Sequence, residues 1–201
     1  MLDQYIAWDQ PTLWIAVAGI AFPPTYWNIV SHYEYHNKFL TKALGGNYAA
    51  CYFLAASIFV FSAIRDLLFD WAMADQPTVY ELAPMALSLA GMACIAVGGI
   101  LVLSSYYRLG ITGTYLGDRM GIYLPARVES FPFSVMEHPM YTGATLCFLG
   151  QALRTGSPAG VFLTVVVAIV YAIAESIEGP FTAMIYAKRA EDAKAAQGKA
   201  E

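Results

Sequence analysis

The sequence predicts an all-α fold, a multi-pass membrane bundle of four to five helical segments forming one domain over residues 1–201. The composition supports this class, because 58% of the residues are hydrophobic and 13% are charged, whereas soluble domains carry about 25% charged residues. The charges are gathered into short stretches that separate uncharged runs, and a helix needs about 20 apolar residues to cross a bilayer. The net charge of −4 argues against a nucleic acid as partner.

The first predicted membrane segment, residues 11–31, contains Pro23 and Pro24. Because each proline removes a helical hydrogen bond, we expect this segment to be kinked or to enter the membrane only part of the way. The polar connection that follows holds His32 and His36. A hydrated helix face explains this pair better than a metal site, so no metal is predicted.

The second and third predicted segments are residues 43–64 and 82–107, and the connection between them is acidic. The third segment is long enough to cross the membrane at a tilt. Its small residues predict a face that packs closely against another helix; they are Gly91, Ala93, Ala96, Gly98 and Gly99.

The last two predicted segments are residues 139–153 and 159–175, joined by a short sequence of turn-forming residues. We therefore predict a tight helical hairpin. Because the two ends of a hairpin lie together, His138 and Tyr141 should lie on the same membrane face as Glu178.

The distribution of basic residues predicts the orientation in the membrane. If all five segments cross, the connections 32–42 and 108–138 share one side with the polar tail 188–201, which we expect to be solvated or frayed. That side carries nine lysines and arginines against two, Arg65 and Arg154, on the other, which places the larger group in the cytosol. The nine are Lys38, Lys42, Arg108, Arg119, Arg127, Lys188, Arg189, Lys194 and Lys199.

The stretch Leu101–Gly143 differs most from ordinary membrane helix, because it combines glycines, tyrosines and arginines with His138. Glycines let the backbone approach a ligand closely, and tyrosine rings can stack on a base or hold a cation. With the carboxylate of Glu178, this stretch predicts a pocket for a polar cofactor beside a lipid at the membrane surface. The sequence contains neither a glycine-rich dinucleotide motif nor a phosphate-binding loop.

An ordered set of motifs resembles the phospholipid methyltransferase family, which includes phosphatidylethanolamine N-methyltransferase and the fungal-type methylene-fatty-acyl-phospholipid synthase. The motifs are Tyr26-Trp27-Asn28, Glu34, Leu101–Ser105, Leu109–Asp118, Phe131-Pro132-Phe133, Pro139-Met140-Tyr141 and Pro180–Tyr186. The segments Glu34–His36 and Leu109–Asp118 lean towards the fungal type. The sequence from His138 to Gly143, with the acidic end of the hairpin, is also similar to the isoprenylcysteine carboxyl methyltransferase superfamily.

The resemblance implies an enzyme of the endoplasmic reticulum membrane that uses S-adenosyl-L-methionine. Its substrates would be bilayer phospholipids, the mono- and dimethylated and also the unmethylated forms of phosphatidylethanolamine, and its product phosphatidylcholine. The implied cofactor-binding residues at the hairpin are Pro139, Tyr141 and Gly143. The paired-glutamate motif of the family falls on Glu178 and Gly179, so its second carboxylate is missing.

The GxG element that the family uses for its cofactor falls on Ala96, Val97 and Gly98, which keep only the last glycine. Gly98 lies about 15 Å inside the third segment. Cofactor contact and helix packing are therefore both open for this element.

Methyl transfer to an amine needs a base, because an amine with a pKa of about 10 is protonated at pH 7. The catalytic candidates are His138, Asp118 and Glu34, with His36 and Glu178 as further possible bases. The unperturbed pKa of His138 suits this role. Asp118 could instead close the turn at 117–121, and Glu34 could cap a helix or pair with Lys38.

The candidate substrate-binding residues are Tyr115, Arg119 and Arg127. Tyr115 could hold a methylammonium group by a cation–π contact. The two arginines could hold the lipid phosphate, although the positive-inside rule alone also explains arginines in this connection.

Two other classes of membrane protein remain as alternatives. A sterol-reductase-like oxidoreductase would need more basic residues for the phosphates of a nicotinamide cofactor. A transporter or scaffold would favour ionisable residues or broken helices at mid-membrane, and only Pro23 and Pro24 come near that.

Overall fold

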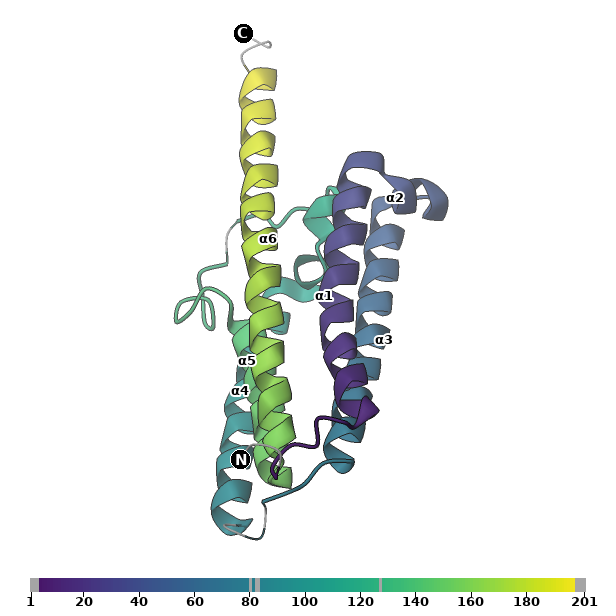
Figure 1. The fold of residues 1–201 in the computed structure, drawn as a ribbon. Helices are drawn as coiled ribbons and strands as arrows, with labels where there is room; N and C mark the ends of the chain where they lie inside the picture. The colour runs from purple at the N-terminus through teal and green to yellow at the C-terminus, as the bar shows by residue number, and fades with distance from the viewer. Residues whose placement is uncertain (1–3, 80, 82–83, 127, 198–201) are drawn as a thin grey trace.

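The computed structural model describes residues 4–79, 81, 84–126 and 128–197, and every regular element in these ranges is helical. Four of the helices are long and apolar enough to cross a membrane, namely α1 (Pro11–Asn37), α3 (Asn47–Ala74), α4 (Pro84–Thr114) and α6 (Pro158–Gln197). The shorter elements are α2 (Phe39–Leu44), the 3-10 helix η2 (Gly117–Met120) and α5 (Pro139–Thr155). The predicted all-α membrane bundle is confirmed (Figure 1).

Helix α1 continues across Pro23 and Pro24, where we expected a kink or a partial entry into the membrane. Both prolines are buried inside the helix, and α1 packs against α3 on one side and α6 on the other. Packing on two neighbours holds the helix where local hydrogen bonding is lost. With 27 residues, α1 is about 40 Å long, which is sufficient to span the hydrocarbon layer.

Helices α3 and α6 extend furthest beyond their predicted ends. Helix α3 continues to Ala74, so Arg65 lies within a helix and not in a connection. Helix α6 continues to Gln197, through most of the tail that we expected to be solvated or frayed; residues 188–195 are exposed, but they are helical. The tail is rich in alanine, lysine and glutamate, which are strong helix formers, and it extends the helix beyond the bundle (Figure 1).

Helices α4 and α5 make the most extensive contact in the bundle, and glycines permit it. A Cβ atom built on Gly91 would lie 2.5 Å from the carbonyl oxygen of Gly150, and one built on Gly98 would collide with that of Gly143. The predicted close-packing face is therefore confirmed at Gly91 and Gly98, whereas Gly99 faces open space.

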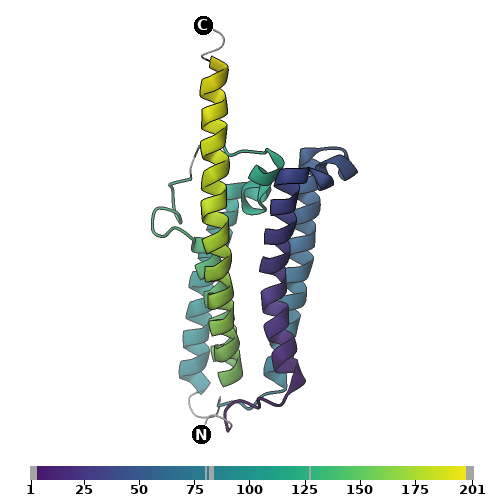
Figure 2. The ribbon, with the colours of Figure 1, turned by 45° about the horizontal axis from the view of Figure 1, so that its top comes forward.

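Helices α5 and α6 form the predicted hairpin. Gly156 ends α5 in the left-handed region at φ 61°, and Ser157 Oγ accepts a hydrogen bond from the backbone N–H of Gly160 in the first turn of α6. The hairpin returns the chain to the end of the bundle where α1 finishes and where α2 and η2 lie (Figure 2). This arrangement brings the beginning of α5 beside the middle of α6, where the candidate site lies.

Candidate functional site

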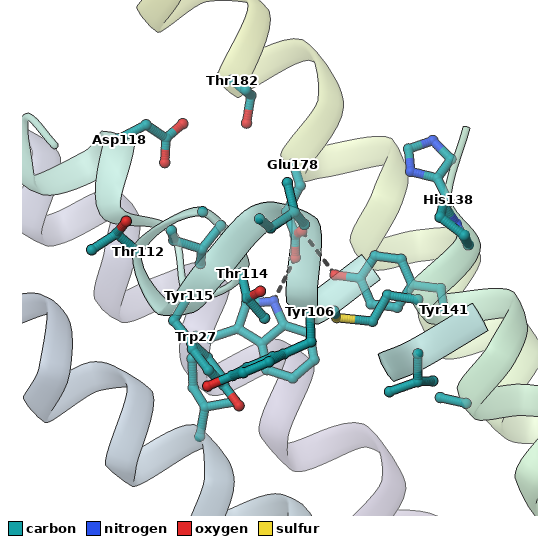
Figure 3. Close-up of a pocket in the computed structure, with 18 of the residues that line it drawn as sticks. Trp27, Tyr106, Thr112, Thr114, Tyr115, Asp118, His138, Tyr141, Glu178 and Thr182 are labelled. Atoms are coloured by element: carbon teal, nitrogen blue, oxygen red, sulfur yellow. Dashed lines mark hydrogen bonds between the residues drawn. The ribbon is translucent and has the colours of Figure 1, made fainter. Parts of the chain in front are cut away.

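A cavity of about 470 Å³ lies between α1, α3, α4, η2, α5 and α6 (Figure 3). Its α6 lining extends from Tyr171 to Tyr186, which corresponds to about 22 Å along the helix axis. Aliphatic and aromatic side chains form most of the wall, and the carboxylates of Asp118, Glu137 and Glu178 face it. A cavity with a few convergent polar groups in an apolar wall is typical of a small-molecule site.

The carboxylate of Glu178 joins three helices inside the cavity. Trp27 of α1 donates its indole N–H to Oε1 at 2.5 Å, and Tyr141 of α5 donates its hydroxyl to Oε2 at 2.8 Å (Figure 3). Asn28 adds a longer bond to Oε1, at 3.3 Å. These donors fix the orientation of the carboxylate, so a ligand meets it in one arrangement.

The 3-10 helix η2 holds Asp118 at the cavity wall and ties it to α6. The guanidinium of Arg119 pairs with Asp118 at 2.5 Å and donates to Thr182 Oγ1 at 3.1 Å. Arg119 is 0% exposed and also lies over the ring of Phe181, 4.6 Å from its centroid. Among the residues that the structure describes, Nε and Nη2 of Arg119 find no hydrogen-bond partner. The buried ion pair therefore places Asp118 beside Thr182.

His138 lies at the rim of the cavity, where it is the N-cap residue of α5. Its side chain is 45% exposed, and Nδ1 is 4.0 Å from Oε1 of Glu175 on α6. The predicted proximity of His138 and Tyr141 to the middle of α6 is confirmed by this contact and by the bond from Tyr141 to Glu178.

A basic group, Arg65 of α3, lines the same cavity. Nη1 donates to the hydroxyl of Tyr171 at 2.6 Å, and Nε and Nη2 contact Oδ1 of the neighbouring Asp66 at 3.0 and 2.9 Å. The guanidinium also lies over the ring of Phe148 at 4.9 Å. The cavity thus has an arginine near Tyr171 and carboxylates at Glu178 and Asp118.

Comparison with known proteins identifies the family. The phospholipid methyltransferase family model matches residues 87–189. The phosphatidyl-N-methylethanolamine N-methyltransferase of Neurospora crassa is 50% identical over 197 residues, 97% of this chain and 92% of the relative. The chain belongs to the phospholipid methyltransferase family.

Human phosphatidylethanolamine N-methyltransferase is 44% identical to this chain over 182 residues, which cover 90% of this chain and 91% of the relative. Phosphatidylethanolamine N-methyltransferase A of Dictyostelium discoideum is 41% identical over 192 residues, 96% and 90% of the two chains. No solved structure matches the chain. The predicted family resemblance is confirmed, and the protein is an enzyme, a phospholipid methyltransferase.

Six of the predicted catalytic, cofactor-binding and substrate-binding residues line the cavity of this methyltransferase. They are Tyr115, Asp118, His138, Pro139, Tyr141 and Glu178. They come from the segment just after α4, from η2, from the start of α5 with its N-cap, and from α6, so the fold brings together residues more than sixty positions apart.

Glu34 lies outside the cavity. Its buried carboxylate accepts hydrogen bonds from the backbone N–H groups of Leu40 at 2.7 Å and Thr41 at 3.3 Å, and from the Thr41 hydroxyl at 2.5 Å. These are the free donors at the start of α2. The structure therefore gives Glu34 the capping role that was the alternative to catalysis.

The GxG-like element also lies away from the cavity. Gly98 and Gly143 face each other across the α4–α5 contact, and neither residue lines the cavity, nor do Ala96 and Val97. Gly179 is exposed on α6, and a Cβ atom there would meet nothing within 4 Å. The geometry favours helix packing for Gly98 and Gly143.

The two arginines predicted to hold phosphate have different outcomes. Arg119 is buried behind the cavity wall and engaged with Asp118 and Thr182. Arg127 lies outside the described residues.

Among the cavity residues that were not site predictions are Trp27, Arg65, Tyr171 and Thr182. Trp27 was named only as part of a family motif, and Tyr171 lies in an apolar run. Arg65 carried no usable signal, because it directly follows an uncharged run and hydropathy therefore assigns it to a connection.

Proposed function

We propose that this enzyme transfers a methyl group from S-adenosyl-L-methionine to the amine of phosphatidylethanolamine derivatives, with phosphatidylcholine as the final product. The relatives' names support an ethanolamine phospholipid as acceptor. The observation that carries the proposal is the Glu178 carboxylate, held by Trp27 and Tyr141 within a largely apolar cavity of a membrane bundle. Mono- and dimethylated lipids are the expected acceptors, and the unmethylated lipid is a further candidate.

The chemistry of the cavity fits this cofactor. Its positively charged sulfonium and ammonium groups, or its ribose hydroxyls, match the carboxylates of Glu178 and Asp118. Its purine matches aromatic side chains of the wall such as Tyr106, Tyr115 and Tyr186. Once bound, the cofactor supplies an electrophilic methyl group.

The residues of the chain must orient the lipid amine and accept its proton. At pH 7 an amine with a pKa of about 10 is protonated, so releasing the proton costs about 4 kcal/mol unless a base or the site environment assists. Asp118, His138 and Glu178 line the cavity and are the candidate bases. Placing the neutral amine in line with the methyl group supplies the remaining acceleration through orientation.

We further propose that the site faces the cytosol at the endoplasmic reticulum membrane. The basic residues Lys38, Lys42, Arg108 and Arg119 belong to the end of the bundle where α2 and η2 lie. A positive excess at one end favours the cytosolic side.

The test is methyl transfer by purified protein with labelled S-adenosyl-L-methionine and a panel of un-, mono- and dimethylated phosphatidylethanolamine. We expect label in phosphatidylcholine with the methylated acceptors, and a loss of at least about 10-fold in Glu178→Gln, which removes the charge and keeps an oxygen acceptor. Folded protein that incorporates no label with any lipid would contradict the proposal and leave the reductase and transporter alternatives.

A further inference from the structure

We infer that Arg65 and Tyr171 form an anion-binding end of the cavity, which holds the carboxylate of the cofactor or the phosphodiester of the lipid. The inference rests on the proposed function for the identity of these ligands. Arg65 lines the cavity, although the charge count along the sequence placed it on the opposite side of the membrane.

Arg65 has donor capacity to spare at this position. Its bonds to Tyr171 and Asp66 use only part of the N–H groups of a guanidinium. Because the Tyr171 hydroxyl accepts from Arg65, its own proton is free to be donated to another acceptor. An arginine and a tyrosine hydroxyl that both line one cavity form a donor pair suited to an oxyanion.

A charge in this position is costly unless it serves a ligand or a structural partner. Arg65 is 8% exposed on a helix that crosses the membrane, and its acidic partner Asp66 does not line the cavity. Ionisable residues that face the interior of a membrane bundle commonly mark a substrate or ion site. The aromatic ring of Phe148 under the guanidinium adds support without using its N–H groups.

The charges of the cavity are arranged to match a zwitterion. Glu178 lies seven residues after Tyr171 on α6, a rise of about 10 Å, so the acidic and basic groups occupy different levels of one cavity. The cofactor carries a cationic sulfonium and ammonium with a carboxylate, and the lipid carries an amine with a phosphodiester. Each ligand therefore needs one cationic protein group together with anionic ones. Among the described residues that line the cavity, Arg65 is the only lysine or arginine.

The experiment compares Arg65→Gln, Arg65→Lys and Tyr171→Phe with Arg154→Gln, an exposed arginine outside the cavity whose replacement makes the same change in charge. Calorimetry in detergent measures the Kd of S-adenosyl-L-methionine and of its decarboxylated form. Kinetics measure the KM of monomethylated phosphatidylethanolamine separately from kcat. Thermal unfolding of each variant establishes that it is folded.

If the cofactor carboxylate is the ligand, Arg65→Gln raises the Kd of S-adenosyl-L-methionine by roughly 10- to 100-fold. The decarboxylated form is then unaffected, and Arg65→Lys recovers part of the loss. If the phosphodiester is the ligand, the Kd of the cofactor is unchanged and the KM of the lipid rises by a similar factor. Tyr171→Phe raises whichever of the two constants, the cofactor Kd or the lipid KM, Arg65→Gln raises. It distinguishes the two ligands if Arg65→Gln does not fold.

The inference is overturned if the folded Arg65 and Tyr171 variants change neither the cofactor Kd nor the lipid KM. It is also overturned if the Kd values of both cofactor forms rise equally, or if Arg154→Gln changes these constants as much as Arg65→Gln does. A wild-type enzyme that methylates no lipid would refute the proposed function instead. The calorimetric comparison would still report on Arg65 in that case.

Discussion

Replacing Gly98 by alanine tests whether this position packs two helices or contacts the cofactor. In the structure, the new Cβ atom would collide with the carbonyl oxygen of Gly143 and lie 2.9 Å from Sγ and 3.1 Å from the backbone nitrogen of Cys147. Backbone atoms cannot move aside by changing rotamer, so α4 and α5 would have to separate. The matched control is Gly99→Ala on the same helix, where a Cβ atom meets nothing within 4 Å.

The expected magnitude follows from two opposing contributions. Overpacking a close contact costs about 1–3 kcal/mol, and alanine in a helix is more favourable than glycine by about 1 kcal/mol. The contact with a backbone oxygen places Gly98→Ala in the upper part of the range, a net loss of about 1–2 kcal/mol. Gly99→Ala should gain up to about 1 kcal/mol because only helix propensity changes.

Thermal unfolding in detergent measures the difference, and titration of the folded variants with S-adenosyl-L-methionine measures binding. For a chain of this size, about 1 kcal/mol corresponds to roughly 2–4 °C in Tm, so Gly98→Ala should unfold roughly 2–8 °C below the wild type with little change in cofactor Kd. A variant with an unchanged Tm and strongly weakened cofactor binding would refute the packing argument and restore the GxG element as a cofactor contact.

Three further substitutions test other parts of the structure. Glu34→Ala should destabilise the protein by about 1–3 kcal/mol, because donors at the start of α2 lose their buried acceptor. Activity per folded molecule should be retained. A large fall in kcat in folded protein would return Glu34 to the catalytic residues. Trp27→Phe removes the N–H donor to Glu178 and keeps an aromatic ring, so cofactor binding or kcat/KM should fall by roughly 3- to 30-fold. Unchanged kinetics would mean that Glu178 needs no fixed orientation. Gly179→Ala should change stability by less than about 1 kcal/mol with unaltered kinetics, because the gain in helix propensity at this exposed position is opposed by contact of the new Cβ atom with the ring of Pro180. A change in cofactor Kd would show that the second position of the paired-glutamate motif matters.

Charge alone was a poor guide to the position of Arg65. The uncharged run ends at Ile64, so hydropathy predicts a connection there, and the structure continues α3 for another ten residues to Ala74. A helix accepts an arginine when its guanidinium finds partners in the bundle, and here Tyr171, Phe148 and Asp66 provide them. Those partners come from α5 and α6 as well as α3, and hydropathy along one segment contains no information about them.

The prolines of α1 make the same point for the backbone. Proline removes local hydrogen bonds whatever its surroundings, which justifies the expected kink or partial membrane entry at Pro23 and Pro24. The structure keeps the helix because α3 and α6 pack against it on both sides. The local rule was sound, and the tertiary contacts outweighed it.

The sequence by itself determined the membrane class, the α5–α6 hairpin and the family. Each depends on properties carried along the chain, which are the length of apolar runs, turn-forming residues and ordered motifs. Only the tertiary structure decided which motif residues share the cavity: it placed Tyr141 and Trp27 on Glu178, gave Glu34 to the start of α2, and put Gly98 between two helices. Those outcomes depend on the direction in which each side chain leaves its helix and on how closely helices distant in sequence approach, and that geometry arises when the bundle packs.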